Sequence, residues 1–218
     1  MPAMNPADNF SAVNVGVGRS CGETLDGEFV CWGTQGQLGP ITAQDLNPDW
    51  TDEELLGLYP IGFGEQVLIV HLDDNRLYQV DIENETVSDP FMDGLEFREV
   101  DTTGGGICGI TVDDEFACSF DIENWEDVEM GSESEPISFS TGVIHGCALY
   151  ADGTAECLGG EGFFDVTAAL EVPDDTLFND IMAGGLISCG LTDEDQAICW
   201  GDPQVEGMSF PSLLEPVQ

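Results

Sequence analysis

Short segments of alternating apolar and polar residues recur along the chain, each broken by a turn of acidic residues or glycine. Near the C-terminus the pattern runs through residues 179–185 and 188–192, a turn at Glu194-Asp195, and then residues 196–201. Period-two alternation bounded by turn residues is typical of β-strands. The pattern therefore predicts three short strands here, with the last two joined in a β-hairpin.

Cysteines mark this hairpin at four places in the chain. The eight cysteines form four pairs whose members are ten residues apart, and each pair brackets a turn signal such as Asp26-Gly27 or Asp152-Gly153. The pairs are Cys21 and Cys31, Cys108 and Cys118, Cys147 and Cys157, and Cys189 and Cys199. The members of a pair face each other in an antiparallel hairpin only if the loop has an odd number of residues.

A three-residue loop satisfies this geometry, with a type I turn followed by a left-handed residue at Gly27. Residues 24 and 28 then close the turn, and Cys21 and Cys31 fall at a non-hydrogen-bonded position with Cα atoms about 4.5 Å apart. Because that separation permits a disulfide, we predict one disulfide within each of the four pairs. Free core cysteines are one alternative. Zinc binding is another, although closely spaced zinc ligands are absent from the sequence.

The hairpin belongs to a longer repeat. In three copies a phenylalanine opens the first strand, eleven residues before the first cysteine. These residues are Phe10, Phe97 and Phe178. A further copy lacks cysteines: Ile69 and Gln79 take their positions, Asp74-Asn75 forms the turn, and the first strand is expected to begin at Leu58. The chain therefore contains five copies, spaced by 39 to 48 residues.

Repeats of about 40 residues built on β-hairpins are typical of propeller blades. The sequence predicts an all-β fold, a β-propeller of about five blades, in which each blade is a small antiparallel sheet built on one hairpin. We expect a single domain over residues 1–218. The expected blades span about 10–57, 58–96, 97–135, 136–177 and 178–218.

The repeats resemble those of the regulator of chromosome condensation family. The resemblance lies in Cys31-Trp32-Gly33 followed by residues 36–39 (Gly-Gln-Leu-Gly), in residues 142–149 followed by Asp152-Gly153, and in Cys199-Trp200-Gly201. The paired cysteines are similar to those of bacterial secreted members. The resemblance covers about residues 10–201 and implies a propeller fold with a general use in binding partners. The sequence departs from the family in having five repeats where a ring of seven is typical.

The charge of the chain is extreme. Asp and Glu number 44, against three arginines and no lysine, and the formal net charge is -41. Such a chain repels itself in dilute buffer, and molar salt screens that repulsion by shortening the Debye length to about 3 Å. We therefore interpret it as adapted to high salt. Three arginines cannot form a basic face, so we expect no nucleic-acid binding, no attraction to anionic membranes and no membrane insertion.

An insertion separates the first two repeats at residues 40–57. Thr51 and Glu54 have the spacing of a capping box, which predicts a short helix in this loop. Trp50, Leu55 and Leu56 are candidate anchors for a partner, together with Trp125 in a later loop. The alternative is that these side chains of the insertion fold back onto the first repeat.

The sequence gives weaker support for a cation site or for catalysis. The segment Asp-Ile-Glu-Asn occurs twice and makes Asp81, Glu83, Asp121 and Glu123 weak candidates for binding Ca²⁺ or another surface cation. The alternative is a solvated acidic surface, and neither segment matches an EF-hand loop. No catalytic motif is present, so we predict that the chain is not an enzyme and has no cofactor. A hydrolase on a propeller is the alternative.

These features lead to a hypothesis about function. Disulfides indicate an oxidising destination, whereas residues 1–10 lack the basic and apolar regions of an export signal. A structural or adhesion protein on the surface of a virion infecting a halophilic microbe satisfies both conditions. Its expected partners are other virion proteins or a host surface glycoprotein or glycan, and homo-oligomers are compatible with this role. The alternatives are a secreted or surface-anchored binding domain of a halophilic microbe and an intracellular scaffold with reduced cysteines.

Overall fold

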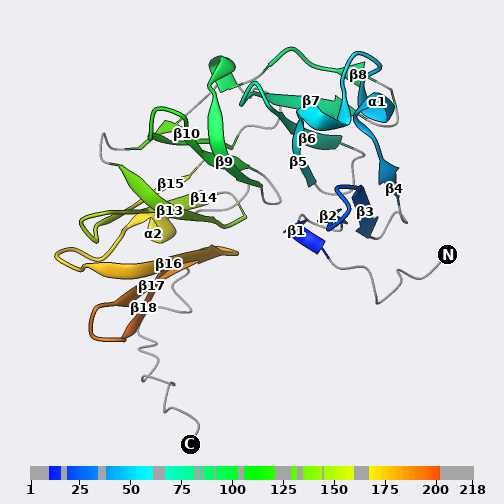
Figure 1. Ribbon diagram of the computed structural model, residues 1–218. Coiled ribbons are helices and arrows are strands. Elements are labelled where there is room, and N and C mark those ends of the chain that lie inside the picture. Colours follow the sequence, from blue (N-terminus) through cyan, green and yellow to red (C-terminus); the bar gives the residue numbers. More distant parts are fainter. Residues whose placement is uncertain are drawn as a thin grey trace, which may run out of the picture. The chain divides into compact units, whose positions relative to one another are not determined.

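The computed structural model describes residues 10–201, with gaps in the loops. The gaps are residues 16–18, 34–37, 61–66, 82–83, 85, 91, 103–105, 121–128, 132–134, 144 and 160–166. Within the described residues, the strands form five small antiparallel sheets: β1–β4, β5–β8, β9–β12, β13–β15 and β16–β18 (Figure 1). The predicted all-β architecture is confirmed, with one sheet for each expected repeat. We number these sheets as blades one to five.

The chain divides into two compact units, residues 1–105 and 106–218. The first unit contains β1 (Phe10–Val15), β2 (Arg19–Thr24), β3 (Phe29–Gly33), β4 (Leu38–Ile41), α1 (Ala43–Leu46), η1 (Asp52–Glu54), β5 (Leu55–Pro60), β6 (Val67–Leu72), β7 (Leu77–Asp81), β8 (Thr86–Val87), η2 (Met92–Gly94) and β9 (Phe97–Thr102). The second contains β10 (Ile107–Thr111), β11 (Phe116–Ser119), β12 (Glu129–Met130), β13 (Pro136–Thr141), β14 (His145–Tyr150), β15 (Ala155–Gly159), α2 (Thr167–Leu170), β16 (Phe178–Gly184), β17 (Ile187–Thr192) and β18 (Ala197–Gly201). The prediction of one domain stays a prediction.

The central hairpin of every blade has the predicted turn. In the first blade, Thr24 and Glu28 close the loop through a backbone hydrogen bond of 2.8 Å, and the amide of Gly27 donates to Thr24 at 2.9 Å. The residue at the position of Gly27 has a positive φ in all five turns. These φ angles are 81° at Gly27, 62° at Asn75, 62° at Asp114, 85° at Gly153 and 58° at Asp195. The turn therefore fixes the same strand register in each blade, including the one without cysteines, where Ile69 pairs with Gln79.

The four predicted disulfides are confirmed. Each joins cysteines that face each other across a hairpin, with Cα atoms 4.0 to 4.1 Å apart, as expected for a non-hydrogen-bonded pair. The chain has no free cysteine. Disulfides persist in oxidising surroundings, so they indicate an extracellular or secreted protein. No helix in the described segments has both the length and the hydropathy needed to cross a bilayer.

Each blade has two faces with different neighbours. The disulfide points toward the following blade: Cys21 and Cys31 lie in a core with Leu55, Leu58 and Leu68 of blade two. We call this side the downstream face and the opposite side the upstream face. In the second unit, Cys147 and Cys157 likewise pack against Phe178, Ile181, Ala183 and Trp200, which lie on the upstream face of blade five. Because strand side chains alternate, every second residue of a strand belongs to the same face.

Two sequence-based boundaries are corrected by the structure. The first strand of the second blade begins at Leu55 rather than Leu58, and Leu55 pairs with Leu72 as Phe10 pairs with Thr24. The reason is that residues 61–66 separate β5 from β6, whereas only residues 16–18 separate β1 from β2, so counting back from the hairpin misplaces the start by three residues. The inserted loop is correspondingly shorter than 40–57, since β4 ends at Ile41 and β5 starts at Leu55.

Candidate functional site

The inserted segment between β4 and β5 contains two short helices rather than one. The predicted capping box is present at η1, where the Glu54 carboxylate accepts hydrogen bonds from the amide of Thr51 at 2.6 Å and from its hydroxyl at 2.8 Å. A second box caps α1, because Thr42 and Asp45 make the same reciprocal contacts. The hydrogen bonds from Thr42 hold the pKa of the Asp45 carboxyl below its ordinary value. The segment is thus an ordered structure.

The predicted anchors on this segment have different environments. Leu55 is 8% exposed and belongs to the core between the first two blades, so its side chain supports the fold and does not face a partner. Trp50 is half-buried against the same core, with its ring 5.3 Å from that of Tyr78. Leu56 is 49% exposed. The alternative interpretation therefore holds for Leu55 and in part for Trp50, and Leu56 offers an exposed apolar side chain. Trp125 lies outside the described residues.

Tyr78 connects this area to the turn of the second blade. Its hydroxyl donates a hydrogen bond of 2.8 Å to the carboxylate of Asp74. Partial burial, together with this hydrogen bond, raises the pKa of Tyr78 to about 12. Arg76 lies 3.5 Å from Glu96, and Arg98 lies 2.6 Å from Glu99. Because these arginines are paired with carboxylates, the surface of the first unit keeps its acidic character.

The cation candidates receive little support from the described residues. The carboxylate of Asp81 accepts hydrogen bonds from the backbone amide and the side-chain amide of Asn84, at 3.0 and 2.7 Å. These contacts explain Asp81 as part of a local turn. Glu83, Asp121 and Glu123 lie outside the described residues. Within the described part of the chain, no group of three His, Cys, Asp or Glu side chains is placed to hold a metal ion.

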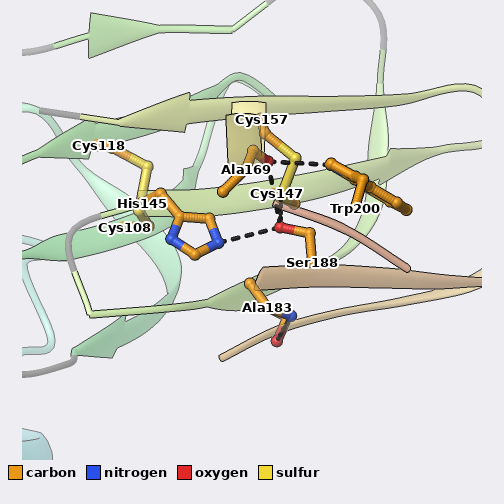
Figure 2. The surroundings of a disulfide bond; sticks show 10 residues. Cys108, Cys118, His145, Cys147, Cys157, Ala169, Ala183, Ser188 and Trp200 are labelled. Carbon is orange, nitrogen blue, oxygen red and sulfur yellow. Dashed lines mark hydrogen bonds between the residues drawn. A yellow bond between two sulfur atoms is a disulfide. The ribbon is translucent and has the colours of Figure 1, made fainter. Parts of the chain in front are cut away.

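A buried polar cluster lies beside the disulfide of the fourth blade (Figure 2). Nε2 of His145 is 3.0 Å from Oγ of Ser188, and that hydroxyl lies 3.2 Å from Sγ of Cys147 and 3.3 Å from the carbonyl oxygen of Ala169. The indole of Trp200 donates to the same carbonyl at 3.0 Å. Because Cys147 is a disulfide cysteine and has no proton, its sulfur can only accept a hydrogen bond, as can the carbonyl oxygen of Ala169.

The direction of these hydrogen bonds decides what the His145–Ser188 pair can do. When the Ser188 hydroxyl donates to the carbonyl oxygen of Ala169, Nε2 of a neutral His145 ring donates to Oγ. Burial lowers the pKa of His145, which agrees with that state. A nucleophilic serine needs the opposite direction, with histidine as the acceptor, and access to substrate. Both side chains are 0% exposed, so the pair holds blades four and five together.

His71 has a similar structural role in the first unit. Its Nε2 lies 2.9 Å from the carbonyl oxygen of Phe97, which can only accept, so Nε2 carries the proton. Burial lowers the pKa of His71 below its ordinary value. The sequence showed both histidines but gave no signal for their partners, which lie 26 and 43 residues away in the chain.

The comparisons with known proteins concern the fold. No protein-family model matches the sequence, and no curated protein matches it. Among solved structures, the CRINKLY WD40 ectodomain of the Arabidopsis thaliana receptor kinase ACR4 is similar with a TM-score of 0.60 and 19% identity, over 97% of this chain and 68% of that one. The ectodomain of the Physcomitrella patens receptor kinase CR4 has a TM-score of 0.64 and 18% identity, over 96% of this chain and 55% of that one. Yeast RCC1 (Prp20), in its complex with Kap60, has a TM-score of 0.56 and 15% identity, over 89% of this chain and 56% of that one.

These similarities decide the fold class. The chain has a β-propeller fold. It spans about two thirds of the first of these structures and little more than half of the other two. The similar structures include an RCC1 protein and a WD40 ectodomain.

Proposed function

We propose that this chain is a non-enzymatic propeller module, related to the regulator of chromosome condensation repeats, that binds other macromolecules outside the cytoplasm at high salt. Its proposed setting is the surface of a virion that infects a halophilic microbe, as a capsid decoration, turret or tail module. The observation that carries the proposal is the joint presence of four disulfides and a net charge of -41. Disulfides suit an oxidising medium, and the charge suits a medium of high ionic strength.

The proposed partners are proteins or surface glycans. The similar structures include RCC1 bound to Kap60 and yeast Prp20p, whose binding to Gsp1p and histones is described. Protein binding on this fold supports a protein partner here. Leu56, which is exposed in β5 directly after the inserted segment that carries half-buried Trp50, is the proposed contact point.

A secreted or surface-anchored binding domain of a halophilic microbe is the second candidate. It is favoured by the same disulfides and charge, and it differs in where the protein resides. Particle fractions and cell-envelope fractions from the source culture therefore distinguish the two candidates.

The experiment follows the protein in a culture of its source at molar KCl. Virus particles are purified by density-gradient centrifugation, and the chain is located in particle, envelope and medium fractions by an antibody and by immunogold microscopy. We expect the protein on the particle surface with all eight cysteines oxidised. Recovery in the envelope or medium fraction supports the second candidate, and recovery in the cytoplasm with reduced thiols contradicts both.

Binding is tested with the immobilised oxidised chain. Leu56→Asp is expected to lower retention of particle or host-surface proteins by at least about tenfold in affinity. Leu25→Asp is the matched control, since Leu25 is an exposed leucine of the first hairpin turn, with an exposed fraction of 68%. Equal retention by the two variants contradicts the proposed contact point.

A further inference from the structure

An acceptor motif for N-linked sugars lies between the last two strands of the second blade. Asn84 and Thr86 are separated by one residue, which is not proline. An asparagine followed at the second position by serine or threonine is the motif at which oligosaccharides are attached through the side-chain amide. Asn84 lies in the turn that connects β7 to β8, and Thr86 is the first residue of β8. The motif is therefore placed in a connection of the kind that carries such sugars.

Both residues of the motif are accessible. Asn84 and Thr86 are exposed, whereas Val80 and Val87, on either side of them, pack into the core of the first two blades. β8 is the last strand in the sheet order of this blade, so the turn leads to the edge of the sheet and not to its interior. A bulky group on Asn84 can therefore be accommodated without any change in that core.

The hydrogen bonds of the turn are compatible with a sugar on Asn84. Its backbone amide donates to Oδ1 of Asp81 at 3.0 Å, and its side-chain nitrogen Nδ2 donates to Oδ2 of the same carboxylate at 2.7 Å. The Nδ2 atom of an asparagine carries two protons, and a glycosidic bond replaces only one of them. The other proton can still be donated to Asp81, so the turn can keep both contacts after the modification.

A second copy of the motif occurs near the N-terminus. It consists of Asn9, Phe10 and Ser11. The hydroxyl of Ser11 lies 3.1 Å from the carbonyl oxygen of Glu23 and 3.0 Å from its carboxylate, and Asn9 lies outside the described residues. The structure thus places the acceptor side chain of one motif, that of Asn84.

The disulfides indicate the compartment in which this modification occurs. Sugars on asparagine are a feature of surface loops in secreted proteins, and disulfides persist in the same oxidising surroundings. All eight cysteines of the chain are paired. The modification therefore requires only the extracellular destination that the disulfides already indicate.

We propose that Asn84 carries an N-linked glycan. The donor is an oligosaccharide joined through its anomeric carbon to a lipid phosphate, and a membrane-bound transferase of the source cell catalyses the step. Nδ2 of Asn84 forms a bond to the anomeric carbon, the bond from that carbon to the phosphate oxygen breaks, and the lipid phosphate leaves. Nδ2 gives up one proton to the transferase in this step.

This modification goes beyond the proposed function and does not depend on the partner that the chain binds. A secreted chain meets the lipid-linked donor as it crosses the membrane. A virion protein meets it as well if it crosses the membrane before the particle is assembled. The fraction in which the chain is found tests the proposed function, whereas the mass of one peptide tests the glycan, so either can fail without the other.

The test uses the chain purified from its source culture at molar KCl, then reduced, alkylated and digested with trypsin. The chain has three arginines and no lysine, so trypsin cleaves only after Arg19, Arg76 and Arg98. Peptide 77–98 contains Asn84, and peptide 1–19 contains Asn9, so the two motifs are separated. Mass spectrometry with electron-transfer fragmentation breaks the backbone and leaves a sugar on its side chain. We expect the added mass of an oligosaccharide on Asn84, and no added mass in the chain produced in a bacterial host that lacks the transferase.

Variants expressed in the source cell assign the acceptor. Asn84→Gln removes the acceptor amide, and Thr86→Ala removes the motif while leaving Asn84 in place, so both are expected to lose the added mass from peptide 77–98 completely. Thr86→Ser preserves the motif and should retain the mass. Asn179→Gln is the control and should also retain it, because Asn179 is exposed but has no serine or threonine two residues later.

Three results overturn the proposal. The first is an unmodified peptide 77–98 from the oxidised chain of the source culture. The second is a sugar on peptide 1–19 alone. The third is an added mass that persists on peptide 77–98 of Thr86→Ala, since that mass is then attached without the motif.

Discussion

The hydroxyl oxygen of Ser188 lies 3.2 Å from the sulfur of Cys147, which places the residue before the first cysteine of one blade against the disulfide of the blade before it. The same relationship recurs between blades three and four. A Cβ atom on Gly146, the residue at the position of Ser188, would lie 2.4 Å from Sγ of Cys108. The disulfides therefore link strands within a blade and also form the packing surface between blades.

The ring of Phe178 leaves no room for a side chain at Gly190. A Cβ atom there would lie 2.2 Å from Cδ1 of Phe178, and that ring is fixed by its contact with Trp200. We expect Gly190→Ala to lower the free energy of unfolding by about 1–3 kcal/mol, because overpacking displaces the ring. Urea unfolding at molar KCl measures this. Gly184→Ala is the control, since no atom lies within 4 Å of its Cβ position, and an equal loss in both variants contradicts the explanation.

Adjacent leucines give a second matched pair. Leu55→Ala removes a side chain from the core between the first two blades and should cost about 2–4 kcal/mol. Leu56→Ala changes an exposed side chain and should stay within about 0.5 kcal/mol of the wild type. Thermal or urea unfolding compares them. A larger loss of stability for Leu56→Ala would mean that Leu56, rather than Leu55, faces the core.

The four disulfides should differ in their ease of reduction. Cys189 and Cys199 are half-buried, whereas the cysteines of the other three disulfides are 0 to 8% exposed. We expect limited dithiothreitol under native conditions to open the 189–199 bond first, because reduction requires access to the sulfur. Isotope-coded alkylation with peptide mass mapping follows the order. Earlier opening of the 147–157 bond would argue against the packing of blade five on blade four.

Loss of a buried disulfide should weaken the fold itself. Replacing Cys147 and Cys157 together by alanine is expected to lower the free energy of unfolding by roughly 2–4 kcal/mol, since the cross-link no longer restricts the unfolded chain. The same change at Cys189 and Cys199 opens a loop of equal length. These two cysteines are only half-buried, so their loss disturbs fewer packing contacts. Urea unfolding should therefore show the larger loss for the first pair, and equal losses would indicate that packing between blades adds nothing.

The buried histidines predict how stability varies with pH. Burial lowers the pKa of His145 below 6.5 in the folded chain, so the unfolded chain binds more protons as pH falls toward that value. The contribution of neutral His145 to the free energy of unfolding is complete above about pH 6.5, and it is lost as the pH falls through the lowered pKa of the folded chain. Unfolding between pH 8 and about pH 5.5, at molar KCl to screen the carboxylates, should show this decline. His145→Gln keeps a donor to Ser188 and should flatten the curve, and an unchanged slope contradicts the assignment.

The five turns were predictable because their geometry is local. A loop of three residues with one left-handed position sets the register over the next few residues, and that register placed Cys21 opposite Cys31 and Ile69 opposite Gln79. The start of β5 at Leu55 was not predictable in this way. It depends on the length of the connection at residues 61–66, which is longer by three residues than the corresponding connection at residues 16–18.

The sequence by itself determined the hairpins, the pairing of the cysteines, the short helix at Thr51 and the acidic character of the surface, because each depends on neighbouring residues or on composition. Only the tertiary structure decided which residues are covered. Val15 and Ala183 occupy the same place in the repeat, and one is 65% exposed whereas the other is 7% exposed. Leu55 and Leu56 are neighbours with equal side chains, and only Leu55 is in the core. Burial depends on which blade lies against each face, and no local pattern of residues contains that information.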